Sequence, residues 1–224
     1  MTRAALLLCA CLLFPLGVSA QDPAPPAVAP GPLEDPIGPF VLDARIGMAR
    51  FKGAPSVAEA LGVPASDLPT RGFGLIVGGH FYPVRKGSFA LGVGGELLLR
   101  ARGTRTIAPA VEDGPDGPTV VTRMSAISPQ VSLNFGRRDG YSYLSGGMGW
   151  GSFSTELEDS PVAEAETRPR VMNYGGGARW FTREHLAFSL DLRFYKIGAQ
   201  EAATERPAYP AATRMVFSAG ISIR

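Results

Sequence analysis

Two histidines, His80 and His185, are the side chains of this chain best suited to acid–base or nucleophilic chemistry. A hydrolytic or acyl-transfer site needs such an imidazole beside a serine or a carboxylate. Neither histidine is expected to have that setting, because each lies where an apolar-alternating segment ends or begins. We therefore interpret both as structural side chains at strand ends, away from the long loops that would form a rim site.

Other patterns that carry chemistry are weak. Cys9 and Cys11 are the only cysteines, and no His, Cys and Asp cluster has the spacing of a metal site. We interpret Glu156, Glu158 and Asp159 as solvated charges rather than as a calcium site. The glycine runs open no helix, so they are not phosphate-binding loops. The sequence thus predicts no cofactor, no catalytic or metal site, and no enzyme.

The first twenty residues are typical of a secretory signal peptide. Arg3 precedes an apolar run, and Val18-Ser19-Ala20 provides the small residues of a cleavage site, so cleavage is expected near Ala20. Both cysteines leave with this segment, and the exported chain is expected to have no disulfide. With 22 basic and 20 acidic residues, the charges nearly balance and predict no nucleic-acid partner.

The rest of the chain divides into two parts. Residues 21–39 contain seven prolines and no apolar periodicity, which predicts a disordered tether. Residues 40–224 contain recurring segments in which apolar and polar residues alternate, the period of strands with two unlike faces. The eight predicted strands are residues 40–51, 71–82, 88–102, 121–135, 141–153, 170–181, 185–196 and 213–224.

The connections between these strands alternate between short and long. The short links are residues 83–87, 136–140 and 182–184, and the long links are residues 52–70, 103–120, 154–169 and 197–212. Three short turns and four long loops place both chain ends with the short turns, as in outer-membrane barrels. The fold class predicted is all-β, an eight-stranded antiparallel up-and-down barrel. Ser56 and Glu59 could form a capping box for a helical turn in the first long link, or that link is irregular.

The polar face of the strands decides between a membrane barrel and a soluble one. A soluble exterior would present Lys, Glu and Thr, whereas here this face is mainly small, which suits the crowded lumen of eight strands. The small residues are Gly92, Gly94, Gly147, Gly149, Gly175, Gly177, Ala187, Ser189, Ser218 and Gly220. The apolar face carries rings near both ends, as expected for two interfacial girdles of a transmembrane barrel. These are Phe40, Phe81, Phe89, Phe135 and Trp180 near the short turns, and Trp150, Phe153 and Phe194 toward the loops.

Six charged residues share the lumen face of the strands. They are Asp43, Arg45, Glu96, Arg179, Asp191 and Arg193. A charge buried without a partner costs several kcal/mol, so we expect an ion-pair network that plugs the lumen and blocks conduction. Arg179 and Asp191 are the expected cross-strand pair, because the shortest turn joins their strands.

The hairpin over residues 170–195 also carries a family resemblance. Its key residues are Asn173, Gly175, Gly176, Gly177, Arg179 and Phe181, then Leu186, Leu190, Asp191, Leu192 and Arg193. They resemble the Asn-x-Gly-Gly-Gly-x-basic-x-aromatic strand and the Leu-Asp-x-Arg strand of small outer-membrane barrels grouped with the OmpA-like transmembrane domain. The resemblance spans residues 40–224 and implies a place in the outer membrane and insertion by the barrel-assembly machinery. No peptidoglycan-binding domain follows Arg224, so a wall-anchoring role is not implied.

The leading functional hypothesis is a non-enzymatic outer-membrane barrel with a structural or surface-interaction role. The alternatives are a narrow channel for small or apolar solutes and a lipid A modifying enzyme. Basic residues gather near the loop ends of the strands, where arginine could meet the phosphates of lipopolysaccharide. The candidate rim residues are Arg100, Arg102, Arg168 and Arg170. Ordinary solvation of the loops explains the same charges, and the sequence does not determine an oligomeric state.

Overall fold

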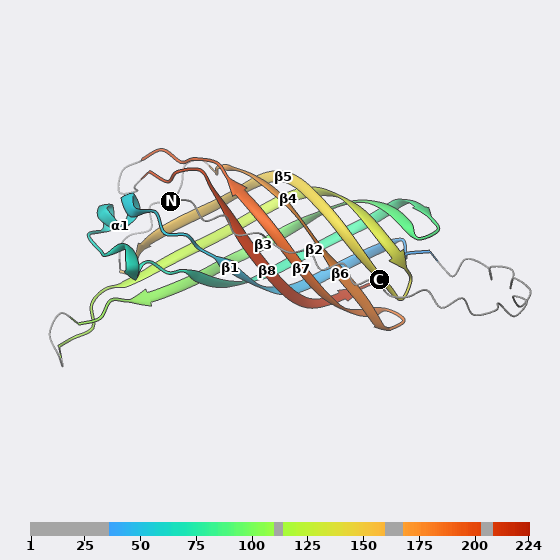
Figure 1. The fold of residues 1–224 in the computed structure, drawn as a ribbon, viewed down its shortest axis with the longest axis horizontal. Helices are drawn as coiled ribbons and strands as arrows, with labels where there is room; N and C mark the ends of the chain where they lie inside the picture. Colours follow the sequence, from blue (N-terminus) through green and yellow to red (C-terminus); the bar gives the residue numbers. More distant parts are fainter. Residues whose placement is uncertain (1–35, 110–113, 160–167, 203–207) are drawn as a thin grey trace, which may run out of the picture. The chain divides into compact units, whose positions relative to one another are not determined.

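Eight antiparallel strands close into one barrel (Figure 1). The structure, a computed structural model, describes residues 36–109, 114–159, 168–202 and 208–224. The predicted signal peptide and most of the predicted tether lie outside these residues. Each strand pairs with the next one in the sequence, and β8 pairs with β1 to close the barrel. The strands are β1 Phe40–Arg50, β2 Arg71–Lys86, β3 Phe89–Thr106, β4 Thr119–Arg137, β5 Gly140–Leu157, β6 Arg170–Arg183, β7 Leu186–Ile197 and β8 Ala212–Ile223. The predicted fold is confirmed.

Three two-residue turns lie at one end of the barrel, which we call the turn end. They are Gly87-Ser88, Arg138-Asp139 and Glu184-His185, and all are shorter than predicted. The first is tight because β2 continues to Lys86 through a register shift between Phe81 and Val84, which accommodates Pro83 inside a strand. Gly87 has φ +56°, a conformation that glycine adopts without steric cost.

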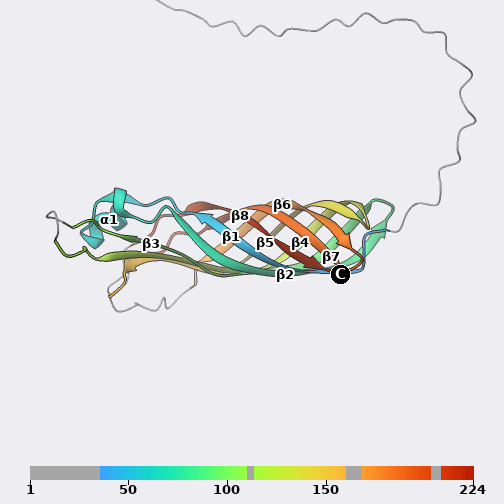
Figure 2. The same ribbon diagram turned by 90° about the horizontal axis from the view of Figure 1, so that it is seen from below.

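The opposite end carries the long connections, and we call it the loop end. Figures 1 and 2 both show helix α1, Pro55–Leu61, at this end, in the link between β1 and β2 that also contains the 3-10 turn η1, Ala65–Asp67. The helix begins with Pro55 in its first turn, and its N-cap Ala54 makes no side-chain cap. A proline suited to the first helical turn, rather than the Ser56–Glu59 box, therefore sets the start. No helix among the described residues is long and apolar enough to cross a membrane.

The outer wall of the barrel is apolar. Ile46, Val131 and Met148 point outward with 68%, 65% and 69% of their surface exposed. Exposed apolar surface over a whole barrel wall is unstable in water and is the lipid-facing belt of a transmembrane barrel. At the turn end this belt includes the exposed rings of Phe40 and Trp180, where an interfacial girdle was predicted.

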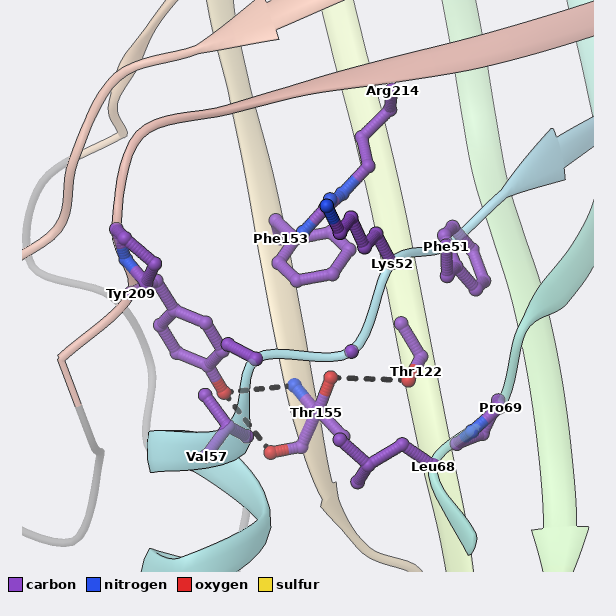
Figure 3. Close-up of a pocket in the computed structure, with 13 residues that line it drawn as sticks. Phe51, Lys52, Val57, Leu68, Pro69, Thr122, Phe153, Thr155, Tyr209 and Arg214 are labelled. Atoms are coloured by element: carbon purple, nitrogen blue, oxygen red, sulfur yellow. Dashed lines mark hydrogen bonds between the residues drawn. The ribbon is translucent and has the colours of Figure 1, made fainter. Parts of the chain in front are cut away.

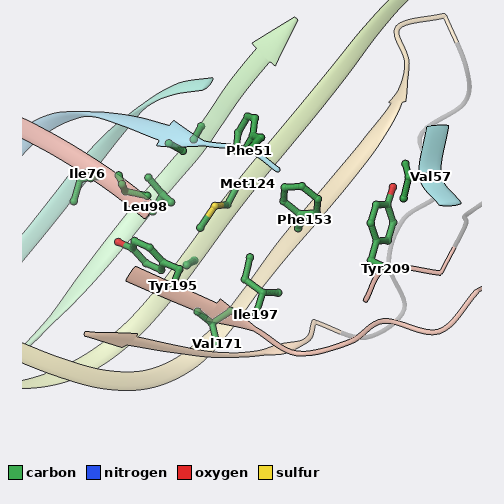
Figure 4. Packing of buried hydrophobic residues seen from close by; sticks show 14 residues of the cluster. Phe51, Val57, Ile76, Leu98, Met124, Phe153, Val171, Tyr195, Ile197 and Tyr209 are labelled. Carbon is green, nitrogen blue, oxygen red and sulfur yellow. The ribbon is translucent and has the colours of Figure 1, made fainter. Parts of the chain in front are cut away.

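The lumen is filled in three layers, and β1 passes through all of them. Val41 lies in an apolar layer at the turn end, with Tyr82 and Tyr141. Asp43 and Arg45 follow in a charged layer. The third layer is apolar and fills the loop-end half of the lumen (Figure 4). Its larger members are Phe51, Ile76, Leu98, Met124, Phe153, Tyr195, Ile197 and Tyr209.

Two sequence predictions need correction at these layers. Phe153 was expected on the outer wall, but it is 8% exposed and lies inside the loop-end layer. β5 has no register shift along its length, so alternation places Phe153 on the same side as Tyr143. Ile37, in the predicted tether, is 1% exposed and packs in the turn-end layer. Packing against the barrel therefore begins before residue 40.

Candidate functional site

All six charged residues predicted for the lumen lie inside it, each at most 6% exposed. Arg179 on β6 and Asp43 on β1 form a two-point ion pair. The Arg179 Nε and Nη2 atoms lie 3.0 and 2.6 Å from the Asp43 Oδ1 and Oδ2 atoms. The guanidinium also lies 4.0 Å from the ring centroid of Tyr143. This paired geometry is the strongest that arginine makes with a carboxylate.

The other four charges form a closed ring of contacts. Arg45 lies 2.5 Å from Glu96 and 3.2 Å from Asp191. Arg193 contacts the same two carboxylates, at 3.2 Å from Glu96 and 3.0 Å from Asp191. Each charge thus has two partners of opposite sign. Three arginines and three carboxylates leave the charged layer neutral, which is the condition for burying such charges at tolerable cost.

Hydroxyl groups occupy the remaining acceptor positions of the three carboxylates. Tyr143 donates to Asp191 at 2.8 Å, and Tyr195 donates to Glu96 at 2.5 Å. Ser222 donates to Asp43 at 2.5 Å. Carboxylates held by arginines and hydroxyls on several sides are fixed in position. The arrangement suits a structural plug rather than a site that must exchange protons or substrate.

The predicted pair of Arg179 with Asp191 is wrong. In the register of β6 and β7, Arg179 faces Ser189 and Asp191 faces Gly177. The two side chains are therefore offset along the barrel by two positions. Arg179 reaches across the lumen to Asp43 instead. Adjacency along the sequence does not decide pairing here, because closure of the barrel through β8 lets side chains of β1 and β6 meet in the lumen.

The histidines lie away from the loop end, as expected. His80 on β2 points into the lumen and is 7% exposed, and neither ring nitrogen has a hydrogen-bond partner among the described residues. His185 lies in the last turn, and its Nδ1 atom is 3.2 Å from the backbone oxygen of Arg224. Within the described residues, no group of three or more His, Cys, Asp or Glu side chains could hold a metal ion.

The four predicted rim arginines do not form one cluster. Arg102 on β3 faces Arg123 on β4 across the ladder, and both point outward beyond the apolar belt. Arg102 lies 2.5 Å from Glu158, and Arg123 is paired with Glu156. Arg123, which fits poorly on a lipid-facing wall, is thus neutralised by a β5 carboxylate where β3, β4 and β5 extend toward the loops.

Arg100 and Arg168 are exposed and take part in neither of these ion pairs. Arg100 has φ +33° and lies where the pairing of β3 with β4 shifts by one residue between Leu98 and Ala101. This bulge restores the inward direction of Ala101 after the adjacent outward residues. Arg168 lies just before β6.

Arg170 lines a groove on the outer wall. A second basic residue, Lys196, also lines this groove, and it was not among the rim residues predicted from the sequence. The groove has a volume of about 460 Å³ and runs over β5, β6 and the end of β7. The register places Arg170 beside Trp150, and it places Met172 between Met148 and Lys196. The groove therefore combines two basic side chains with an apolar surface. Lys196 is the last outward residue of β7, and the outward residues before it are apolar. This change from apolar to basic side chains was the signal in the sequence.

The groove exists because neighbouring strands differ in length at the loop end. Pairing between β5 and β6 stops at Trp150 and Arg170, whereas β5 continues to Leu157. β7 likewise ends at Ile197. The outer wall is therefore recessed beside the extended part of β5, at the level where the apolar belt meets the charged rim.

Comparison with solved structures gives matches to bacterial barrels. Neisserial surface protein A matches with 12% identity and a TM-score of 0.51, over 83% of this chain and 97% of that one. The outer membrane protein OprG from Pseudomonas aeruginosa matches with 10% identity and a TM-score of 0.50, over 85% and 97%. The outer membrane protease OmpT from Escherichia coli reaches a TM-score of only 0.39, over 69% and 64%. That last likeness supports no inference about activity.

No protein-family model matches the sequence, and neither does any curated protein. At 10–12% identity, the structural matches show the fold alone. They are matches to eight-stranded barrels rather than to the OmpA-like group in particular. The closed ladder, the apolar wall and these matches agree, and the chain has the eight-stranded barrel fold of outer-membrane proteins.

Proposed function

We propose that this protein is a non-enzymatic integral outer-membrane protein whose outer wall binds the phosphorylated lipid of the outer leaflet, lipopolysaccharide. The observation that carries the proposal is the groove lined by Arg170 and Lys196 above Met148, Met172 and Trp150. Lipid A presents phosphate groups beside acyl chains. A groove with cations at its rim and apolar side chains below matches that order of polar and apolar parts.

The two cations are available for a ligand. Among the described residues, no carboxylate lies within ion-pair distance of Arg170 or Lys196. Arg102 and Arg123, in contrast, are already held by Glu158 and Glu156. Arginine binds phosphate through two parallel hydrogen bonds and lysine binds it as a point charge. The groove is therefore better suited to a phosphate than the predicted rim arginines on β3.

The structure of the lumen supports a binding role over a channel. Two apolar layers enclose the charged layer, and a polar solute would have to cross both. In the proposed orientation the loop end faces outward and the turn end faces the periplasm. The groove then lies at the level of the outer leaflet, where lipopolysaccharide is found. Insertion by the barrel-assembly machinery belongs to the same proposal.

The experiment compares lipopolysaccharide binding by the purified wild-type barrel with binding by Arg170→Gln/Lys196→Gln. Loss of two charge-assisted contacts should weaken binding about tenfold or more, since each tenfold corresponds to about 1.4 kcal/mol. The matched control is Arg50→Gln/Arg71→Gln. These two exposed arginines lie at the loop end, where they face each other across the ladder of β1 and β2, but they do not line the groove.

A second comparison tests separately how the acyl chains and the phosphates of lipid A contribute to binding. Trp150→Ala should weaken binding of both lipid A and dephosphorylated lipid A, because it removes apolar surface. The double glutamine variant should affect only the phosphorylated form. Equal losses in the groove variant and the Arg50/Arg71 control would contradict the proposal, because they would indicate attraction to rim charge in general.

A further inference from the structure

A second pocket lies at the mouth of the lumen, at the loop end, and it is independent of the outer groove. Figure 3 shows residues from the link after β1, from β4 and β5, and from the start of β8 around it. Phe51 and Phe153 meet edge to face, with ring centroids 5.9 Å apart, and Phe153 meets Tyr209 in the same way at 5.7 Å. These three rings belong to the apolar loop-end layer of the lumen, and they form the side of that layer that lines the pocket.

The polar groups around these rings are mostly satisfied by one another. The Tyr209 hydroxyl receives a hydrogen bond from the Thr155 backbone nitrogen at 2.9 Å and donates to the Thr155 backbone oxygen at 3.0 Å. The Thr122 and Thr155 hydroxyls are 3.0 Å apart. Figure 3 shows these bonds along one side of the pocket. The wall is therefore a fixed structure that does not depend on a ligand.

Arg214 is the exception. It is 7% exposed, its guanidinium lies 4.6 Å from the ring centroid of Phe153, and its Nε atom has no hydrogen-bond partner among the described residues. No described carboxylate lies within ion-pair distance of it. A buried guanidinium without a counter-charge is costly. The three lumen arginines deeper in the barrel each have a carboxylate, so Arg214 differs from every other buried arginine of the described chain.

A second cation, Lys52, lines the same pocket from the link that leads into α1. Figure 3 shows both Lys52 and Arg214 among the side chains that line the pocket. No acidic residue in the described part of the chain lines the pocket. Arg214 is buried, so water screens its charge poorly, and the exposed Lys52 adds a second positive charge at the entrance. An anion bound in this pocket would provide the counter-charge that Arg214 lacks among the described residues.

The size of the pocket limits which anion fits. Its free volume for a water-sized sphere is about 10 Å³, close to the minimum that holds one water molecule. A chloride ion is somewhat larger than a water molecule, and a tetrahedral oxyanion such as sulfate or phosphate is several times larger, so chloride needs the smaller widening of the pocket. The exposed side chain of Lys52 can move to provide it. We propose that the mouth pocket binds one monatomic anion of the size of chloride, held by Arg214 and Lys52. This site does not depend on the lipid-binding role proposed for the outer wall.

Such an anion would connect parts of the chain that are distant in sequence. Arg214 belongs to β8, and Lys52 belongs to the link that holds α1. Bridging both cations would fasten that link over the mouth and remove the cost of the unpaired guanidinium. The bound state is therefore more stable than the empty one by an amount that depends on anion concentration.

The test measures thermal unfolding of the full-length barrel in detergent at constant ionic strength, with sodium chloride exchanged for sodium gluconate. Chloride at several times its Kd should raise Tm by about 2–4 °C. Bromide should act similarly, whereas sulfate should not. Arg214→Met should abolish the difference between chloride and gluconate, and Lys52→Met should reduce it. The control Arg71→Met, an exposed arginine at the same end, should leave it intact.

A direct measurement keeps the test valid even if a variant fails to fold. Wild-type crystals grown in bromide should show an anomalous peak within hydrogen-bond distance of the Arg214 guanidinium. Absence of that peak together with equal Tm values in chloride and gluconate would overturn the proposal, since water would then occupy the pocket. Equal stabilisation by sulfate and chloride would also overturn it, because the pocket would not select by size.

Discussion

Arg179 and Asp43 are paired across the lumen although 136 positions separate them in the sequence. Neither residue is exposed by more than 3%. The pair joins β6 to β1 through the interior, so it links two parts of the wall that share no ladder. It is therefore the contact through which the stability of the charged layer is best tested.

Asp43→Ala should destabilise the barrel by about 3–5 kcal/mol, because it leaves the buried Arg179 guanidinium without its carboxylate. Asp43→Ala/Arg179→Met should cost less than Asp43→Ala alone, since no unpaired charge remains. Urea unfolding in lipid vesicles measures both. Arg102→Gln is the control: the side chains of Arg102 and Glu158 are 45% and 44% exposed, and such a pair contributes at most about 1 kcal/mol. A double variant that is less stable than Asp43→Ala would contradict the explanation.

The wild-type barrel should not conduct ions in planar bilayers. Asp43→Ala/Arg179→Met should not conduct either, because the layers that contain Tyr82 at the turn end and Leu98 at the loop end remain packed. A porin reconstituted in the same bilayer serves as the positive control. A stable, long-lived open state of the wild-type protein would show that the layers do not seal the lumen, and it would favour the channel alternative.

Gly177, which faces the lumen, and Gly146, which faces outward, should differ in how well they tolerate a side chain. A Cβ added at Gly177 would lie 2.7 Å from the Tyr143 hydroxyl oxygen and disturb its bond to Asp191, so Gly177→Ala should cost about 1–3 kcal/mol. Gly146 faces outward, and a Cβ there would meet nothing closer than 3.5 Å. Gly146→Ala should be neutral or stabilising by up to about 1 kcal/mol. Equal effects in urea unfolding would argue against a crowded lumen.

The orientation of the barrel can be read from cysteine labelling, because the chain without its first twenty residues has no cysteine. Ala110 and Glu164, which belong to two of the long links predicted from the sequence, lie outside the described residues. Glu59 on α1 and Ser88 in the first turn are both described and exposed. Glu59→Cys should react with an impermeant maleimide on intact cells, and Ser88→Cys should react only after permeabilisation. The reverse pattern would invert the proposed orientation.

The sequence alone determined the strands and their order, and it predicted the face of most strand residues, with Phe153 as an exception. Alternation with period two is a local property, because each residue's direction follows from its neighbour's. It placed Asp43, Arg45 and Glu96 inside and Met172 outside without knowledge of the fold. The sequence also contains a pattern that indicates where the lumen itself is apolar. Successive apolar residues such as Leu97, Leu98 and Leu99 put apolar groups on both faces, which indicates the apolar loop-end layer of the lumen.

Only the tertiary structure decided which residues meet. Ion pairing depends on closure between β1 and β8 and on the stagger of every ladder, and these fix the height of each residue in the barrel. In the ladder of β6 and β7, Arg179 lies two positions away from the residue opposite Asp191. Arg179 therefore pairs with Asp43 instead. The outer groove and the mouth pocket arise in the same way. Arg170 and Lys196, or Arg214 and Lys52, come together because strands of unequal length end at one rim, which no local pattern encodes.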